Sequence, residues 1–213
     1  MKITIINPNS SVSMNAGILE SAKRIATPED SLRMLCVEES PALINSAVDE
    51  VRAAFWTLKK AEELASSTDG FVIACHSDPA VKAIREATGK PAVGIGFASL
   101  STAAKLSGKS AILAISEKSI PRKTELAKRY GFEGLFDAFG TGYTEEMREE
   151  EILDCLSRAI NEALKRGEYA SFVLGCAGMA SVATSLREKF RLPIIDGTEE
   201  AVRILKKSRG LSV

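Results

Sequence analysis

Two cysteines, Cys75 and Cys176, follow apolar segments that resemble each other closely. Residues 70–75 read GFVIAC and residues 171–176 read SFVLGC, and a proline opens a further apolar segment sixteen or seventeen residues after each cysteine. Small residues and the start of an expected helix come after both cysteines. A thiol near a helix N-terminus is favoured as the thiolate by the helix dipole and by exposed N–H groups. The sequence therefore predicts a matched pair of active-site thiols.

Paired thiols on opposite sides of a ligand suit reversible proton transfer at a carbon acid. One thiolate removes a proton and the opposing thiol delivers another to the other face, which inverts the centre. The alternative is that both are buried small hydrophobes, since free cysteine is commonly buried. Equivalent positions in a repeat favour the functional interpretation. Cys36 and Cys155 have no such counterparts, and we expect them to pack in the core.

Other chemistry is limited by the residue types available. His76 is the single histidine, so a histidine-rich metal site is excluded, and no CxxC pair suggests zinc. A disulfide between Cys75 and Cys176 is a further but weaker interpretation, because a substrate-sized gap would keep the sulfurs apart. We therefore expect no metal site.

The elements that must position the thiols alternate between strand and helix. Nearly continuous apolar runs are typical of strands buried on both faces of a parallel sheet, and alternation with helical patterns indicates an α/β fold. The expected strands are residues 2–6, 32–37, 70–75, 91–95, 110–115, 135–139, 171–176 and 193–195. Helical periodicity is expected within residues 11–26, 42–66 and 144–166.

The order and spacing of these segments indicate an internal duplication, with halves of about 1–108 and 109–213. We predict two similar Rossmann-like lobes with parallel four-stranded sheets, related by a pseudo-twofold axis. The expected domains are 1–97, completed by 198–213, and 98–197, with the active site in the cleft between them. In parallel α/β sheets, ligands bind outside the carboxyl ends of the strands.

Polar residues at other strand ends are expected to line the same cleft. Asn7, Ser10 and Ser11 follow the first strand, where amide, hydroxyl and backbone N–H groups can bind polar or anionic ligand atoms. An ordinary cap and turn is the alternative. Ser116 follows the equivalent strand of the second half, and His76 is placed either to tune Cys75, to contact the substrate, or to face outward.

Two aspartates have expected structural roles. Asp78 is predicted to cap the helix that follows Cys75, with Pro79 in its first turn. Asp196 is interpreted as a turn or cap residue that also lies at a strand end.

The motifs resemble those of the Asp/Glu/hydantoin racemase superfamily, particularly its hydantoin and allantoin racemase branch, over nearly the whole chain. The matching segments are INPNS at 6–10, CHSDP at 75–79, PAVGIG at 91–96, LGCAGM at 174–179 and PIIDG at 193–197. The resemblance implies two lobes with the site between them and a cofactor-independent mechanism in which both cysteines act as acid and base. It also implies that Asn7 and the groups after each cysteine, namely His76, Ser77, Ala177 and Gly178, hold the ligand.

The resemblance also bears on the substrate. The amino-acid racemases of this superfamily typically have Cys-Asn-Thr and Cys-Thr-His at the two sites, which Cys75-His76-Ser77 and Cys176-Ala177-Gly178 do not match. Phe97 stands where hydantoin racemases often carry an acidic residue. We expect a racemase or epimerase acting on a 5-substituted hydantoin or a related cyclic ureide. The alternatives are an amino-acid racemase, a maleate isomerase, a decarboxylase-like enzyme, or a two-lobed small-molecule binding protein without catalysis.

Composition supports a globular protein with a small-molecule substrate. Lys and Arg number 28, as do Asp and Glu, so the net charge of zero and the lack of basic runs argue against a nucleic-acid partner. No apolar stretch approaches the roughly 20 residues of a membrane span. The apolar run at the start of the sequence is too short for a signal segment. We expect a cytoplasmic protein with no membrane partner, and the family resemblance implies a homo-oligomer.

Overall fold

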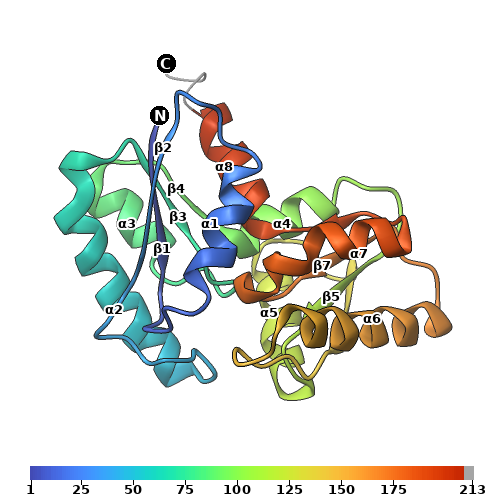
Figure 1. Ribbon diagram of the computed structural model, residues 1–213. Coiled ribbons are helices and arrows are strands. Elements are labelled where there is room, and N and C mark those ends of the chain that lie inside the picture. The colour runs from blue at the N-terminus through green and yellow to red at the C-terminus, as the bar shows by residue number, and fades with distance from the viewer. Residues whose placement is uncertain (209–213) are drawn as a thin grey trace.

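The computed structural model describes residues 1–208 and forms two four-stranded parallel sheets, with strand orders β2-β1-β3-β4 and β6-β5-β7-β8 (Figure 1). The predicted α/β class and all eight predicted strands are confirmed, and the ends shift by one or two residues. The strands are β1 Lys2–Asn7, β2 Ser31–Cys36, β3 Gly70–Ile73, β4 Ala92–Gly94, β5 Ser110–Ala114, β6 Phe136–Gly140, β7 Ser171–Leu174 and β8 Ile194–Ile195.

The helices alternate with these strands, as expected. They are α1 Asn15–Lys23, α2 Ala47–Leu64, α3 Val81–Thr88, α4 Ile95–Ala103, α5 Ile120–Arg129, α6 Glu149–Arg166, α7 Ala183–Phe190 and α8 Gly197–Ser208. Short 3-10 turns are η1 Ala65–Ser67, η2 Glu117–Ser119 and η3 Ala177–Val182. Among residues 1–208, none of the helices has the length and apolar character needed to cross a bilayer.

The two sheets repeat each other in register as well as in order. Phe71 of β3 pairs with Ala92 of β4, and Phe172 of β7 pairs with Ile194 of β8. The N–H of Phe71 donates to the carbonyl of Pro91 at 2.9 Å, and the N–H of Phe172 donates to the carbonyl of Pro193 at the same 2.9 Å. The similarity noted between the two cysteine segments is therefore a structural repeat.

Burial explains why the central strands are continuously apolar. Every residue of β3, β5 and β7 is buried, because helices cover both faces of each sheet. The edge strand β2 instead alternates, with Ser31 and Arg33 exposed. An edge strand of this kind carries a weaker signal than a central one, yet its apolar face was still enough to predict it.

Each sheet is covered in part by a helix from the other half of the chain. Ala201, Val202 and Leu205 of α8 pack with Ile3 and Ile5 of β1, on the face that α1 also covers. In turn, α4 supplies Leu100 and Ala103 to the cluster that contains Ile112 and Val173 of the second sheet. The sequence predicts that residues 198–213 complete the first lobe. The last part of this segment, 209–213, lies outside the described residues. The exchange of α4 and α8 joins the halves tightly.

Helix α2 begins at a capping box and leaves an apolar stripe exposed. The N–H of Asp49 donates to the Ser46 hydroxyl at 3.1 Å, and the N–H of Ser46 donates to the Asp49 carboxylate at 3.0 Å. The sequence pattern groups Val51 and Phe55 with the apolar face of this helix, but they are 71% and 53% exposed. The small residues on the other side of the helix, not these large ones, meet the sheet.

The helices α4 and α8 are equivalent in the repeat, but their N-termini are capped differently. Asp196 precedes α8 and accepts from the N–H of Thr198 at 2.8 Å, as the sequence predicts for a cap residue. The equivalent residue before α4 is Gly94, which has no side chain, and the carboxylate of Asp78 takes its place. Asp78 accepts from the N–H groups of Gly96 at 2.8 Å and Phe97 at 2.6 Å.

The prediction that Asp78 caps the helix directly after it is therefore wrong. That helix, α3, begins only at Val81, after Ala80 in the left-handed conformation, with no side-chain cap. A Cβ atom at Gly94 would lie 2.1 Å from an Asp78 carboxylate oxygen, so glycine is required for the carboxylate to reach α4. The hydroxyl of Tyr130, the residue after α5, also donates to Asp78, at 2.6 Å.

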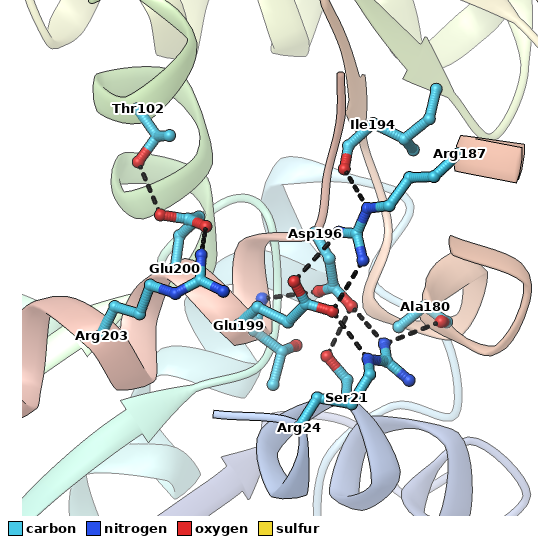
Figure 2. Close-up of polar contacts among 11 residues, drawn as sticks. Ser21, Arg24, Thr102, Ala180, Arg187, Ile194, Asp196, Glu199, Glu200 and Arg203 are labelled. Carbon is cyan, nitrogen blue, oxygen red and sulfur yellow. Dashed lines mark hydrogen bonds and ion pairs between the residues drawn. The ribbon is translucent and has the colours of Figure 1, made fainter. Parts of the chain in front are cut away.

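An ionic network of buried carboxylates and partly exposed arginines joins the end of α1 to α7, the end of β8 and α8 (Figure 2). Arg24 donates to Asp196 at 3.1 Å and to Glu199 at 2.7 Å, and Arg187 donates to Glu199 through two nitrogens at 3.0 Å each. Arg24 also donates to the carbonyl of Ala180 in η3, at 3.3 Å. Since η3 directly follows Cys176, this network fixes the turn that carries the second thiol.

Candidate functional site

The two thiols occupy equivalent places, each two residues beyond a central strand. The strands β3 and β7 end at Ile73 and Leu174, earlier than predicted, and both cysteines stand on the turns that follow. Both residues are partly exposed and both are free thiols. They lie beyond the carboxyl ends of their sheets, where ligands bind in parallel α/β folds.

Each thiol receives a backbone N–H from the residue two positions later. That donor is Ser77 for Cys75 and Gly178 for Cys176. Cys75 has a second partner in its turn, since its sulfur lies 3.3 Å from the Ser77 hydroxyl oxygen. The repeat thus extends from the strands to the hydrogen bonds made by the sulfurs.

Each cysteine turn is covered by a helix from the other half of the chain. The second-half helix α5 lies over the Cys75 turn, where Arg129 donates to the carbonyl of Ser77 at 3.2 Å. The first-half helix α1 lies over the Cys176 turn, where a Cβ atom added at Gly17 would lie 3.6 Å from the Cβ of Ser181. These reciprocal contacts bring the two turns to the junction of the halves.

Burial raises the pKa of both thiols. The Ser77 hydroxyl and N–H lower the pKa of Cys75, and the Gly178 N–H lowers that of Cys176, but burial is the larger influence at both. The expectation that helix termini would favour the thiolates is thus only half met, since the donors are present and are outweighed. A negative charge on Cys75 also raises the pKa of Cys176, which places the two sulfurs within electrostatic reach.

A lysine lies beside the Cys176 turn, and its charge acts on both thiols. Lys123, in the first turns of α5, donates to the carbonyl of Gly175 at 2.7 Å, beside Cys176. Its positive charge lowers the pKa of both Cys75 and Cys176. Burial lowers the pKa of Lys123 itself, and the charges of the two cysteines act in the opposite direction.

The loop after β6 brings a tyrosine and a glutamate to the Cys176 side. A Cβ atom at Gly178 would lie 2.1 Å from the Tyr143 hydroxyl, so the ring reaches the cysteine turn. Burial and the neighbouring Cys176 raise the pKa of Tyr143. Glu145 raises the pKa of Cys176, and its buried Oε2 atom has no hydrogen-bond partner among the described residues.

The predicted polar loop after β1 is organised by its own hydrogen bonds. The buried Asn7 amide donates to the Ser11 carbonyl at 3.1 Å and to the Asn15 side chain at 3.2 Å. The Ser11 hydroxyl lies 2.9 Å from that of Ser13, and the N–H of Ser10 donates to the carbonyl of Pro41 at 3.3 Å. Asn7 therefore shapes the loop, and Ser10 and Ser11 remain partly exposed on it.

The remaining predicted residues differ in how they face the site. Ser77 and Gly178 are partly exposed beside the thiols, whereas Ala177 is buried in the core of the first half. Ser116 is partly exposed and belongs to a turn, in which its N–H donates to the Ser119 hydroxyl at 3.2 Å.

His76 is buried against α4, which excludes the outward-facing alternative among the three that the sequence left open. Its Nε2 lies 3.4 Å from the Ser99 hydroxyl, and its Nδ1 has no partner among the residues described. Burial first, and then the charge of Lys123, hold the pKa of His76 well below its usual range. The ring is neutral at physiological pH.

The other two cysteines do not join the site as a repeat pair. Cys155 is buried in the core beside α7, as expected. Cys36 was expected in the core as well, but it ends the edge strand β2 and is partly exposed. Within residues 1–208, no three His, Cys, Asp or Glu side chains gather closely enough to bind a metal ion.

Lys123, Tyr143 and Glu145 are the site residues that sequence reasoning missed. A lysine on an amphipathic helix and polar residues in a loop look the same in sequence whether they face solvent or a thiol. The one available signal was the repeat, because residues that follow β5 and β6 occupy strand ends in the same way as those that follow β3 and β7.

A duplicated parallel α/β chain, with a thiol after the third strand of each half, defines the two-lobed fold of the racemase-like class. Residues 3–205 match the family model described as Asp/Glu/Hydantoin racemase. The chain is 32% identical over 210 residues to a hydantoin racemase of Pseudomonas sp. (strain NS671), covering 95% of this chain and 84% of the relative. It is 29% identical to a hydantoin racemase of Paenarthrobacter aurescens, covering 96% and 89% of the two chains.

A solved structure gives the same result. The allantoin racemase from Klebsiella pneumoniae superposes with a TM-score of 0.90 at 28% identity, covering 99% of this chain and 88% of that one. The chain belongs to the Asp/Glu/hydantoin racemase family, and it is a racemase of that superfamily, an isomerase.

Proposed function

We propose that the protein is a cofactor-independent racemase of a 5-substituted hydantoin or a related cyclic ureide, with Cys75 and Cys176 as the acid–base pair. The observation that carries this proposal is the equivalence of the two thiols. Each stands two residues beyond a central strand, is partly exposed, and accepts the N–H of the residue two positions later.

The proposed reaction begins with one sulfur as thiolate and the other as thiol. The thiolate takes the proton from the stereogenic carbon and becomes a thiol, while the C–H electron pair moves into the enolate. The opposing thiol then gives its proton to the other face of that carbon and becomes the thiolate. No atom is gained or lost, and the configuration at carbon is inverted.

The substrate class is supported by acidity and by the polar groups beside the thiols. The C–H of a cyclic ureide is more acidic than that of a free amino acid, so a thiolate is a strong enough base. Backbone N–H groups near the sulfurs can stabilise the oxygen of the developing enolate. The unpartnered Oε2 of Glu145 supplies an acceptor for a ureide N–H, since a buried acceptor without a partner is costly.

Racemisation in D2O tests this proposal. Single enantiomers of a panel of hydantoins are incubated with the protein, and chirality and deuterium at the stereocentre are followed by chiral chromatography and NMR. We expect inversion with incorporation of one deuterium. A panel that shows neither exchange nor inversion would remove the racemase assignment to this substrate class.

Single cysteine variants test the roles of the thiols. We expect Cys75→Ser and Cys176→Ser each to lower racemisation by roughly 10²- to 10⁴-fold, the usual contribution of a general acid or base. Cys36→Ser is the matched control, because Cys36 is also free and partly exposed but has no repeat partner. Full activity in either of the first two variants would exclude that cysteine from the mechanism.

A further inference from the structure

One lysine, Lys123, lies beside a site in which each half of the chain contributes an equivalent thiol and turn. Lys123 is half-buried at the junction of the halves, and its ammonium is held 2.7 Å from the carbonyl oxygen of Gly175, the residue before Cys176. The same helix also contacts the Cys75 turn, where Arg129 donates to the carbonyl of Ser77 at 3.2 Å. The charge of Lys123 accordingly acts on Cys75 as well as on Cys176. One ammonium therefore serves thiols that come from two different turns.

The first half has no equivalent cation. Helix α1 covers the Cys176 turn as α5 covers the Cys75 turn, but residues 8–22, which include the loop and most of α1, contain neither lysine nor arginine. The repeat thus supplies two thiols and only one lysine in this position.

We propose, on the basis of the function proposed above, that Lys123 is a positioning residue whose one positive charge is shared by Cys75 and Cys176 and offsets part of the cost of forming one thiolate at a time. Racemisation by two bases requires this state, because two thiols would lack a base and two thiolates would lack an acid. During the reaction the negative charge passes from one sulfur to the other. The charge of the ammonium acts on both sulfurs, so it favours the thiolate before and after each turnover, in either direction.

The other charges around the thiols agree with a single ionisation. Asp78 raises the pKa of Cys75, and Cys75 and Glu145 raise the pKa of Cys176, so these negative charges oppose a second thiolate. Lys123 is the positive group that acts on both thiols.

Other ionisable groups also act on the Lys123 ammonium. Arg122, its neighbour on α5, and the two cysteines all act on its ammonium, and so does Asp78. His76 is held neutral in part by the lysine charge, so it does not compete as a second cation.

The test measures the thiols directly and does not depend on turnover. Each protein is treated briefly with iodoacetamide over a range of pH, and alkylation of each cysteine is quantified by peptide mass spectrometry. The pH profile of a cysteine is its alkylation rate plotted against pH. Because only the thiolate reacts, this profile reports the ionisation of that thiol. For Lys123→Met we expect both profiles to move up by about one pH unit, so that alkylation near neutrality is roughly tenfold slower at both sites.

Two further variants separate charge from structure. Lys123→Arg retains the positive charge and should restore both profiles in large part. Lys128→Met removes an exposed lysine from the same helix and should leave both unchanged. Unchanged profiles in Lys123→Met, or a shift at only one of the two cysteines, would overturn the sharing of one charge.

A measurement on proteins that retain Lys123 covers the case in which Lys123→Met does not fold. Removing one thiol in Cys75→Ser should move the Cys176 profile to lower pH, because the lysine charge then has one partner. No shift would contradict the proposal. A protein that fails to racemise any hydantoin but gives the expected alkylation profiles would refute the proposed substrate and leave the role of Lys123 intact.

Discussion

Replacing Asp78 by asparagine should change the way that stability depends on pH. Burial raises the pKa of Asp78 from an ordinary 3.8 to about 6, even though Tyr130, Phe97 and Gly96 all donate to its carboxylate. A carboxyl whose pKa is raised on folding binds its proton more tightly in the folded state. Its contribution is therefore fully present below about pH 4 and is lost as the pH rises through about 6.

The magnitude follows from the size of the shift. About two pKa units at 1.36 kcal/mol each correspond to roughly 3 kcal/mol. Asp78→Asn keeps the volume of the side chain and cannot ionise. The free energy of unfolding of the wild type minus that of the variant should therefore fall by about 3 kcal/mol between about pH 4 and pH 7.

Urea unfolding at several pH values, followed by circular dichroism, provides the measurement. Asp137→Asn is a useful contrast, because hydrogen bonds from Lys109 and Tyr169 outweigh burial and lower the pKa of Asp137. The difference for that variant should rise with pH over the acid range. A difference for Asp78→Asn that stays constant within about 1 kcal/mol, or that rises, would refute the reasoning.

Two further substitutions test the turn that carries the second thiol. Gly178→Ala places a methyl group 2.1 Å from the Tyr143 hydroxyl, so we expect racemisation to fall by about 10²-fold with the fold retained, as measured by chiral chromatography and circular dichroism. Activity equal to the wild type would show that the turn adapts freely. Arg24→Met leaves the buried Asp196 without its ion-pair partner and Glu199 with one arginine, and should lower the free energy of unfolding by about 3 kcal/mol in urea titrations. A loss below about 1 kcal/mol would mean that solvent replaces Arg24 in the network.

The sequence was informative where burial and the repeat both constrain it. The central strands are apolar along their whole length because both faces are covered, so β3 and β7 were predictable, and with them the equivalence of Cys75 and Cys176. Cap and turn chemistry is local, so the role of Asp196 at the start of α8 also followed from the sequence.

Long-range contacts account for what the sequence did not reveal. Asp78 has the residue type of a local cap, but its carboxylate reaches Gly96 and Phe97, eighteen and nineteen residues away. Lys123 lies near both thiols only because α5 crosses to the other half of the chain. The apolar residues Val51 and Phe55 fit the helical period, but small residues on the opposite side of α2 are the ones that meet the sheet.

The exchange of α4 and α8 has a consequence for biosynthesis. A chain leaves the ribosome from its N-terminus, and early domains generally fold first. Here the face of β1 that carries Ile3 and Ile5 is covered by α8, which is translated after every other described element. The first sheet therefore stays unfinished while the second is made, because α1 covers only part of this apolar face and the rest stays exposed until residues 197–208 have emerged.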